Sequence, residues 1–358
     1  MKNRRILFIL ILFLELTACD LRKTVGSGEE SPLQPPAPVT FDPLTEMFPA
    51  GLYYGRTLLT PEEQNAYDFI LKSFLTEPVT DERKSTTQII VRLKENGFPL
   101  TEAQVVKIFD FISKDDPRTA LLTSSVLPRR SNNIGDTYNP SGTAIADEAR
   151  FDNAFKGMTL GTFWETFHKS QTAEMETRIQ PILDTVNKNM TEAQKVRALH
   201  DAFLATVTYG TANSRGDGNL RGAFLNPLNN PETEVRYVVC QGYAVSFQYL
   251  LMRCGIPAIT VTGTALSTPG DPNTKGSHAW NKVCIDENWY LVDPTHDDSL
   301  VWNSPTCRYD YFLKADGSVP THEEGVLPDG SKTGYPVFPK TAESDFPLNQ
   351  TVRSGDSQ

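Results

Sequence analysis

The stretch that most constrains the fold is SHAWNKVCIDENWYLVDPTHDD, residues 277–298, in which two apolar runs flank a short polar segment at 286–288. Two such runs around a tight turn are typical of a β-hairpin. In an antiparallel hairpin the numbers of opposed residues have a constant sum. That sum is 573 if Asp286 and Glu287 form a two-residue turn, and 574 if the turn has three residues.

The register decides whether one histidine and one aspartate meet. With a sum of 573, His278 faces Thr295, and Asp293 lies two residues along on the same side of the hairpin. This diagonal relation brings a carboxylate within reach of an imidazole. With a sum of 574 the two side chains point to opposite faces. A two-residue turn is therefore what a His-Asp pair requires.

A helix with a cysteine at each end precedes the hairpin. It runs from Cys240 to Cys254, and Gly255 followed by Pro257 is its stop signal. Residues 258–262 then read as a strand. A thiol nucleophile needs a lowered pKa and a base, which a helix N-terminus and a nearby imidazole supply. Cys240 lies at the start of the helix, whereas Cys254 lies at its end, where the helix dipole disfavours a thiolate. We therefore interpret Cys254 as a packing residue.

Three further helices begin with capping boxes, at Thr60, Thr101 and Thr191. Behind each cap, apolar residues recur at helical spacing, which indicates faces buried in a core. The first two caps predict a helical N-terminal region over residues 51–130. Residues 210–234 are rich in Gly, Asn and Pro, and a loop of this length is often functional.

The N-terminus has the pattern of an export signal. Basic residues precede the apolar run 6–14, which is too short to span a bilayer, and Leu16-Thr17-Ala18-Cys19 follows. This run resembles the lipobox of bacterial lipoproteins, which implies a signal peptide over 1–18 and lipidation of Cys19. The alternative is ordinary secretion with cleavage nearby. We expect a lipid-anchored protein on the extracytoplasmic face of the cell membrane, or on the outer membrane if the cell is Gram-negative.

Composition excludes some functions. The hydrophobic content of 39% and charged content of 22% are those of an ordinary globular protein. Loss of residues 1–18 removes three basic residues and one acidic residue, so the formal charge of −10 becomes −12. A nucleic-acid partner is therefore not expected. Residues 19–50 are Pro-rich and predict a flexible tether, and 346–358 predict a disordered tail. The sequence leaves open whether Cys254 and Cys284 form a disulfide.

Three ordered motifs carry a family resemblance: VVCQGYAVSF, SHAWNKV and WYLVDPTHDD. They resemble the bacterial branch of the transglutaminase-like superfamily, a papain-related thiol fold, over residues 190–315. The resemblance implies a Cys-His-Asp triad at Cys240, His278 and Asp293. It also implies an α+β fold, in which the helical region is followed by a transglutaminase-like domain over 150–345, with an antiparallel sheet and a central helix that starts at the catalytic cysteine.

The sequence departs from that pattern twice. Many members carry Asp-Gly at the hairpin turn, where this chain has Asp286-Glu287, and a Trp where it has His296. The first departure concerns the register, and the second the rim of the site. We assign no role to His200, His296 or His322. Asp297 and Asp298 lack the spaced oxygen ligands of a calcium site and are interpreted as solvated loop acids.

The expected activity is acyl transfer from an amide bond of a protein or peptide through a thioester on Cys240, with hydrolysis favoured over transamidation because water is always available. The partners are a protein or peptide substrate, including cell-wall peptides, and the membrane. No cofactor and no metal are predicted. The alternative is a catalytically silent binding module or cell-wall assembly factor that uses the same groove.

Overall fold

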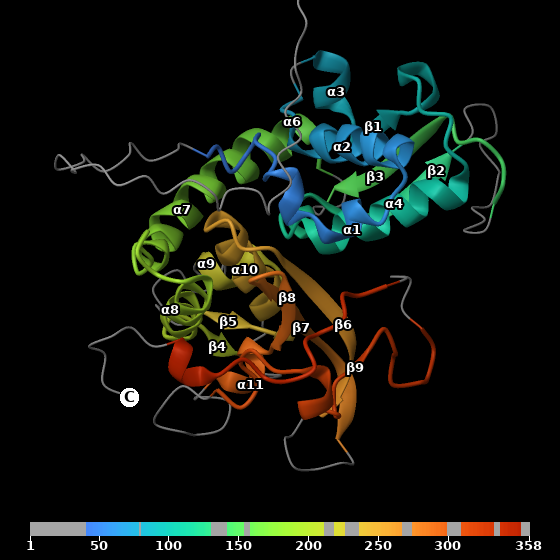
Figure 1. Ribbon diagram of the computed structural model, residues 1–358. Helices are drawn as coiled ribbons and strands as arrows, with labels where there is room; N and C mark the ends of the chain where they lie inside the picture. The colour runs from blue at the N-terminus through green and yellow to red at the C-terminus, as the bar shows by residue number, and fades with distance from the viewer. Residues whose placement is uncertain are drawn as a thin grey trace, which may run out of the picture. The chain divides into compact units, whose positions relative to one another are not determined.

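The computed structural model describes residues 41–78, 80–129, 142–153, 158–210, 218–225, 236–266, 274–298, 309–332 and 337–351 (Figure 1). The predicted signal peptide, Cys19, residues 20–40 of the predicted tether, Cys307 and residues 352–358 lie outside the described residues. Every described element belongs to one compact unit, Phe41–Gln358. Within the described ranges, no helix is both long enough and apolar enough to cross a membrane.

The first part of this unit combines helices with a small sheet. Its helical elements are η1 (Ala50–Leu52), α1 (Tyr54–Thr57), α2 (Pro61–Leu75), α3 (Asp81–Ser85), η2 (Lys94–Asn96), α4 (Glu102–Asp115) and α5 (Thr119–Leu122). The predicted capping boxes at Thr60 and Thr101 are both formed, as is the one at Thr191. The apolar stripes behind the first two caps face the core, with Tyr67 of α2 and Ile108 of α4 fully buried.

The sheet in this region was not predicted. Its strands are β1 (Gln88–Arg92), β2 (Thr123–Arg129) and β3 (Glu148–Asn153), which pair antiparallel in the order β1-β3-β2. Ile89 and Val91 of β1 alternate into the core, where Phe151 of β3 lies against Phe74 of α2 at a ring-centroid distance of 4.7 Å. The sheet therefore packs against the helices and shares one hydrophobic core with them.

The second part supplies the remaining elements. Its helices are α6 (Leu160–Thr162), the π-helix η3 (Phe163–Lys169), α7 (Ser170–Leu183), α8 (Glu192–Leu204), α9 (Leu220–Phe224), α10 (Cys240–Arg253), α11 (Pro294–Asp297), η4 (Asp316–Ser318) and η5 (Leu348–Gln350). Its strands are β4 (Thr208–Tyr209), β5 (Tyr237–Val238), β6 (Ala258–Leu266), β7 (Lys275–Ile285), β8 (Asn288–Val292) and β9 (Glu323–Glu324). Helix α9 lies within the predicted loop 210–234, whose other parts are mostly outside the described residues.

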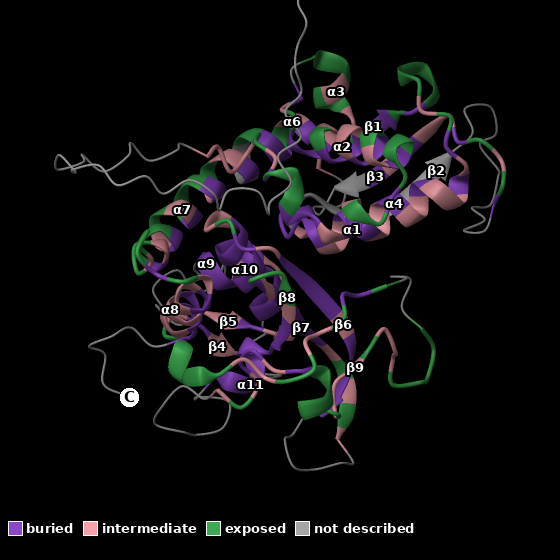
Figure 2. Ribbon diagram, viewed as in Figure 1, coloured by how far each residue is buried: buried purple, intermediate pink, exposed green. Residues whose placement is uncertain are grey.

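Helix α10 is the centre of this part. It packs against β6 and β7 on one side and against α8 and α9 on the other. Residues 242–252 are all buried, and α10 accordingly appears purple in Figure 2. A helix that is buried on every side is a core helix. The main sheet is antiparallel in the order β8-β7-β6-β9. The predicted α+β fold, with an antiparallel sheet and a central helix beginning at Cys240, is confirmed.

The hairpin has the register that a two-residue turn requires. Asn281 pairs with Val292 and Ile285 with Asn288, so opposed numbers sum to 573. Asp286 and Glu287 both have positive φ, at 47° and 67°. Positive φ at both central residues defines a type I′ turn, which suits the twist of two-residue hairpins but favours Asn or Gly. The twist of the strands therefore outweighs the local preference of these two acidic residues.

The ends of the domain extend further than predicted. Residues 41–50, expected to be tether, pack on the domain, where Phe48 is buried and stacks on Phe41 at 4.7 Å. Residues 346–351, expected to be part of a disordered tail, also pack. Phe346 lies edge-on to Tyr290 at 5.5 Å, and Thr351 is buried. Aromatic side chains at both ends explain the difference, because burying each one stabilises the docked segment.

Candidate active site

Cys240 lies at the first turn of α10, partly buried. The chain approaches through β5, which pairs in parallel with β4, and Val239 at the N-cap has an extended backbone. Because a valine side chain cannot cap, the first N–H groups of this 14-residue helix receive no side-chain cap. The positive end of the helix dipole therefore lies at the cysteine.

His278 connects Cys240 to Asp293. It lies in β7, opposite Gly263 of β6, and its Nε2 is 2.7 Å from Oδ2 of Asp293. Cys240 also acts electrostatically on the same imidazole, so its thiol lies close to the ring. Since Nε2 faces the carboxylate, Nδ1 is the ring nitrogen left for the thiol. The structure thus brings together all three residues that the motifs singled out.

Asp293 is held in place by the helix that it begins. Its Oδ1 accepts the backbone N–H groups of Thr295 at 3.0 Å and His296 at 3.2 Å, so it is the N-cap of α11. The ladder of the hairpin ends at Val292, one residue before it. The carboxylate therefore extends beyond the last pair of the ladder, with one oxygen fixed by the backbone and the other free to face His278.

Burial and charge oppose each other at this pair. Burial disfavours the His278 imidazolium, but the Asp293 charge, the hydrogen bond to Asp293 and the interaction with Cys240 raise the pKa of His278 to about 10. Burial likewise disfavours the Asp293 carboxylate, but the charges of His296 and His278 hold the pKa of Asp293 well below its usual range. These effects favour an imidazolium at His278 and a carboxylate at Asp293.

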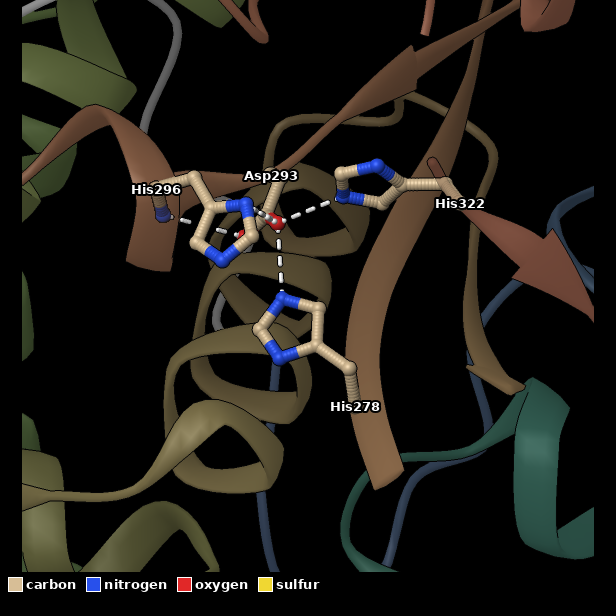
Figure 3. A group of neighbouring side chains, drawn as sticks. All are labelled: His278, Asp293, His296 and His322. Atoms are coloured by element: carbon tan, nitrogen blue, oxygen red, sulfur yellow. Dashed lines mark hydrogen bonds and ion pairs between the residues drawn. The ribbon is translucent and has the colours of Figure 1, made fainter. Parts of the chain in front are cut away.

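Two histidines to which the sequence analysis assigned no role also contact Asp293 (Figure 3). Nε2 of His322 lies 2.9 Å from Oδ2, and Nδ1 of His296 lies 3.0 Å from the same atom. His296 is buried rather than at the rim, and its ring stacks on His278 at 4.5 Å. Its position three residues after Asp293, on the helix that Asp293 caps, is a signal from which this contact could have been predicted.

His322 reaches the site because of a close approach between strands. It directly precedes β9, which pairs with β6 at Gly263 and Thr264. A Cβ atom at Gly263 would lie 2.2 Å from the carbonyl oxygen of Glu323 and 2.9 Å from the Trp280 ring. Only glycine lets β9 pack there. No local pattern around His322 signals this arrangement.

The two acidic residues after His296 are not solvated loop acids. Asp297 is fully buried and Asp298 is 1% exposed. An oxygen of Asp297 lies 3.4 Å from Nε2 of His200, and burial raises the pKa of Asp297 to about 6. Asp298 accepts a hydrogen bond from the hydroxyl of Tyr243 in α10. These side chains tie α11 to α8 and α10 beneath the site, so His200 has a structural role.

The other described cysteines take no part in the site. Among the described residues, no disulfide joins Cys240, Cys254 and Cys284 to one another. Cys254 lies at the C-cap of α10, packs against the core, and has a pKa that burial raises to about 11. A thiol with so high a pKa is a weak nucleophile at neutral pH. The interpretation of Cys254 as a packing residue is therefore confirmed.

The histidine cluster also has the donors of a metal site. One ligand atom from each of His278, Asp293, His296 and His322 lies within 4.8 Å of the others. Imidazole nitrogens with a carboxylate oxygen suit divalent transition metals. This group was not foreseen from the sequence, because it depends on His322.

Comparison with known proteins is consistent with this geometry. Residues 181–294 match the model of the transglutaminase-like superfamily, and this span includes Cys240, His278 and Asp293. No curated protein matches the chain.

Three solved structures show weak likeness. A structure described as a TGase has 15% identity and a TM-score of 0.25, over 50% of this chain and 46% of its own. A protein of Cytophaga hutchinsonii proposed to be a cysteine protease has 16% identity and a TM-score of 0.24, over 48% and 61%. The periplasmic domain of TgpA from Pseudomonas aeruginosa has 15% identity and a TM-score of 0.23, over 45% and 60%.

Each match spans less than two thirds of the solved chain, and likeness at this level says nothing of activity or substrate. The family therefore rests on the sequence model, together with a fold in which an antiparallel sheet packs on a helix that begins at a cysteine. Over residues 181–294, the chain carries a domain of the transglutaminase-like superfamily.

Proposed function

We propose that the protein is a thiol enzyme that cleaves amide bonds of proteins or peptides through a thioester on Cys240, with water favoured over an amine as the acceptor. One observation carries the proposal: Nε2 of His278 lies 2.7 Å from Oδ2 of Asp293, and the same imidazole interacts with Cys240 at the start of α10. A nucleophile, a base and a group that orients the base are the minimum set for covalent acyl transfer.

The chemistry follows from this arrangement. The Cys240 thiolate attacks the carbonyl carbon of the amide, and the imidazolium of His278 then protonates the departing amine as the thioester forms. Water, deprotonated by the neutral imidazole, attacks the thioester and releases the acid. Asp293 keeps the proton of His278 on Nε2, so Nδ1 is the atom that exchanges protons with the thiol and the leaving group. First-turn N–H groups of α10 are the expected donors to the oxyanion.

Location and substrate are part of the same proposal. The pattern over residues 2–19 supports export and lipid anchoring through Cys19. An enzyme held at the extracytoplasmic face meets proteins, peptides and cell-wall peptides, which all offer amide bonds. The proposed substrate class is therefore peptide or protein, and the membrane is a partner through the lipid alone.

The test compares two products in two variants. Peptide cleavage and incorporation of a labelled amine are measured on wild type, on Cys240→Ala and on Cys254→Ala, which is a matched control on the same helix. We expect cleavage to exceed amine incorporation in the wild type, to fall about 1,000-fold or more in Cys240→Ala, and to persist in Cys254→Ala.

A Cys240→Ala variant as active as wild type would remove the proposed mechanism. If wild type forms neither product and Cys240 is alkylated no faster than a free cysteine, the protein is instead the silent binding module. Amine incorporation in excess of cleavage would reverse the preferred acceptor while leaving the nucleophile in place.

A further inference from the structure

Three imidazoles converge on one carboxylate oxygen in the candidate site (Figure 3). Ring nitrogens of His278, His322 and His296 lie 2.7, 2.9 and 3.0 Å from Oδ2 of Asp293. They come from β7, from the segment before β9 and from α11. A His-Asp pair needs one of these imidazoles, so the other two call for an explanation.

Hydrogen bonding alone does not account for all of them. A carboxylate offers about four lone-pair sites, two on each oxygen. Oδ1 of Asp293 already accepts two backbone N–H groups, from Thr295 and His296. Oδ2 then faces three ring nitrogens with two sites. A cation placed among the three nitrogens and Oδ2 removes this excess, because every one of the four atoms then donates a lone pair to it.

The opposite side of each ring is also held. Nδ1 of His322 lies 3.3 Å from the hydroxyl of Thr321, the backbone of Leu266 is hydrogen-bonded to His296, and Cys240 interacts with His278. Histidines that bind metals are held in the same way, with one nitrogen on the metal and the other on a hydroxyl, carbonyl or similar partner that fixes the ring. The rings are therefore oriented before any ligand arrives.

We propose that Asp293, His296 and His322, together with His278, bind a divalent transition cation such as Zn²⁺. The four ligand atoms lie within 4.8 Å of one another. In a tetrahedral zinc site with bonds of 2.0–2.1 Å, neighbouring ligand atoms are about 3.3 Å apart. Side-chain adjustments of about an ångström therefore complete the site. Imidazoles bind as neutral ligands, so protons that they carry are released to solvent.

Occupancy of this site has a regulatory consequence, which rests on the proposed function. A cation on Nε2 of His278 and Oδ2 of Asp293 occupies both atoms of the bond that orients His278. The bound cation is therefore an inhibitor of the thiol, and its removal restores reactivity.

The binding test does not depend on the thiol. The full chain carrying Cys240→Ala, purified in detergent, is titrated with Co²⁺ and then with Zn²⁺. We expect one Co²⁺ per chain with a dissociation constant of about 10 µM or tighter, the visible absorption of four-coordinate Co²⁺, and displacement by Zn²⁺. No binding at about 100 µM metal would overturn the proposal.

Variants and diffraction locate the ion. In the same background, His296→Gln and His322→Gln are each expected to weaken binding about 100-fold or more, whereas His168→Leu, a control at a buried histidine in η3, is expected to bind like the parent. Equal binding by all three would overturn the site. Anomalous scattering at the zinc edge places the ion independently of variant stability, and an ion elsewhere would also overturn it.

The regulatory part is tested separately in protein that retains Cys240. Zn²⁺ is expected to slow alkylation of Cys240 by iodoacetamide at least tenfold, and a chelator to restore the rate. Zn²⁺ should protect far less in His322→Gln, and equal protection there would mean that the thiol itself binds zinc, which overturns the regulatory part. If Co²⁺ binds as expected but no amide is cleaved under any condition, the metal site stands and the proposed function fails.

Discussion

Replacement of Asp293 by Asn removes a charge while keeping the shape of the site. The side-chain oxygen of Asn can still accept the N–H groups of Thr295 and His296, so α11 keeps its cap. The amide nitrogen then takes the place of Oδ2 and donates to Nε2 of His278. The proton of the neutral imidazole is thereby moved to Nδ1, the atom that must accept a proton from Cys240.

The magnitude follows from the pKa of His278. Burial opposes the charged ring, but Asp293 and Cys240 raise this pKa from 6.5 to about 10, which corresponds to about 5 kcal/mol in favour of the imidazolium. Without the Asp293 charge, burial prevails and the ring is neutral at pH 6.5 and above. A thiol beside an imidazolium is alkylated faster than a thiol beside a neutral ring. We therefore expect alkylation of Cys240 at pH 6.5 to fall about tenfold or more in Asp293→Asn.

Turnover is expected to fall further, by about 10⁴-fold, as it does when the matching carboxylate of serine proteases becomes an amide. The assay is the rate of iodoacetamide alkylation of Cys240, mapped by mass spectrometry. The control is Asp297→Asn, at a buried carboxylate that lies 3.4 Å from His200. Alkylation of Asp293→Asn at the wild-type rate at pH 6.5 would refute the argument that Asp293 sets the protonation of His278.

Four changes elsewhere test the fold. Glu287→Gly is expected to raise the free energy of unfolding by about 1 kcal/mol in urea, because Glu287 has a φ of 67°; a decrease would contradict the type I′ turn. Thr191→Ala removes the capping box of α8 and is expected to lower the free energy of unfolding in urea by about 1 kcal/mol. In Lys282→Met, the partly exposed carboxylates of Asp316 and Glu324 lose the fully buried ammonium that lies 3.1 and 2.5 Å from them. We expect the free energy of unfolding, measured by thermal unfolding, to fall by about 2 kcal/mol. Burial, aided by the charge of Arg118, lowers the pKa of His168 to about 4, so its contribution to stability is present above pH 6.5 and is lost as the pH falls. Between pH 7.5 and 4.5, the free energy of unfolding of His168→Leu should therefore fall by about 2.5 kcal/mol less than that of wild type. Parallel pH profiles of the two proteins would contradict the lowered pKa of His168.

The parts of the fold that could be predicted from the sequence are those with local rules. The three capping boxes lie within four residues each, and all of them form. The hairpin register follows from the length of its turn alone, although Asp286 and Glu287 are poor residues for positive φ. The resemblance carried by the three motifs pointed to Cys240, His278 and Asp293, and the structure places Nε2 of His278 2.7 Å from Oδ2 of Asp293.

The unpredicted parts depend on contacts between distant segments. His322 enters the site only because Gly263 lets β9 approach β6, and nothing in the local sequence shows this. Asp297 was interpreted as solvated because it is acidic and follows a hairpin, but α11 turns it inward to His200. The sheet of β1, β2 and β3 was missed because β1 and β2 pair with β3, which follows both of them in the chain, rather than with each other.

The central claim, that Cys240 forms a thioester with the acyl part of an amide, is tested most directly by acid-quenched mass spectrometry of the protein during turnover of a peptide substrate. The account predicts an adduct on Cys240 whose mass is that of the acyl part of the substrate, released by hydroxylamine and absent in Cys240→Ala. Turnover by the wild type with no adduct at Cys240 under any quench condition, together with equal turnover by Cys240→Ala, would contradict it.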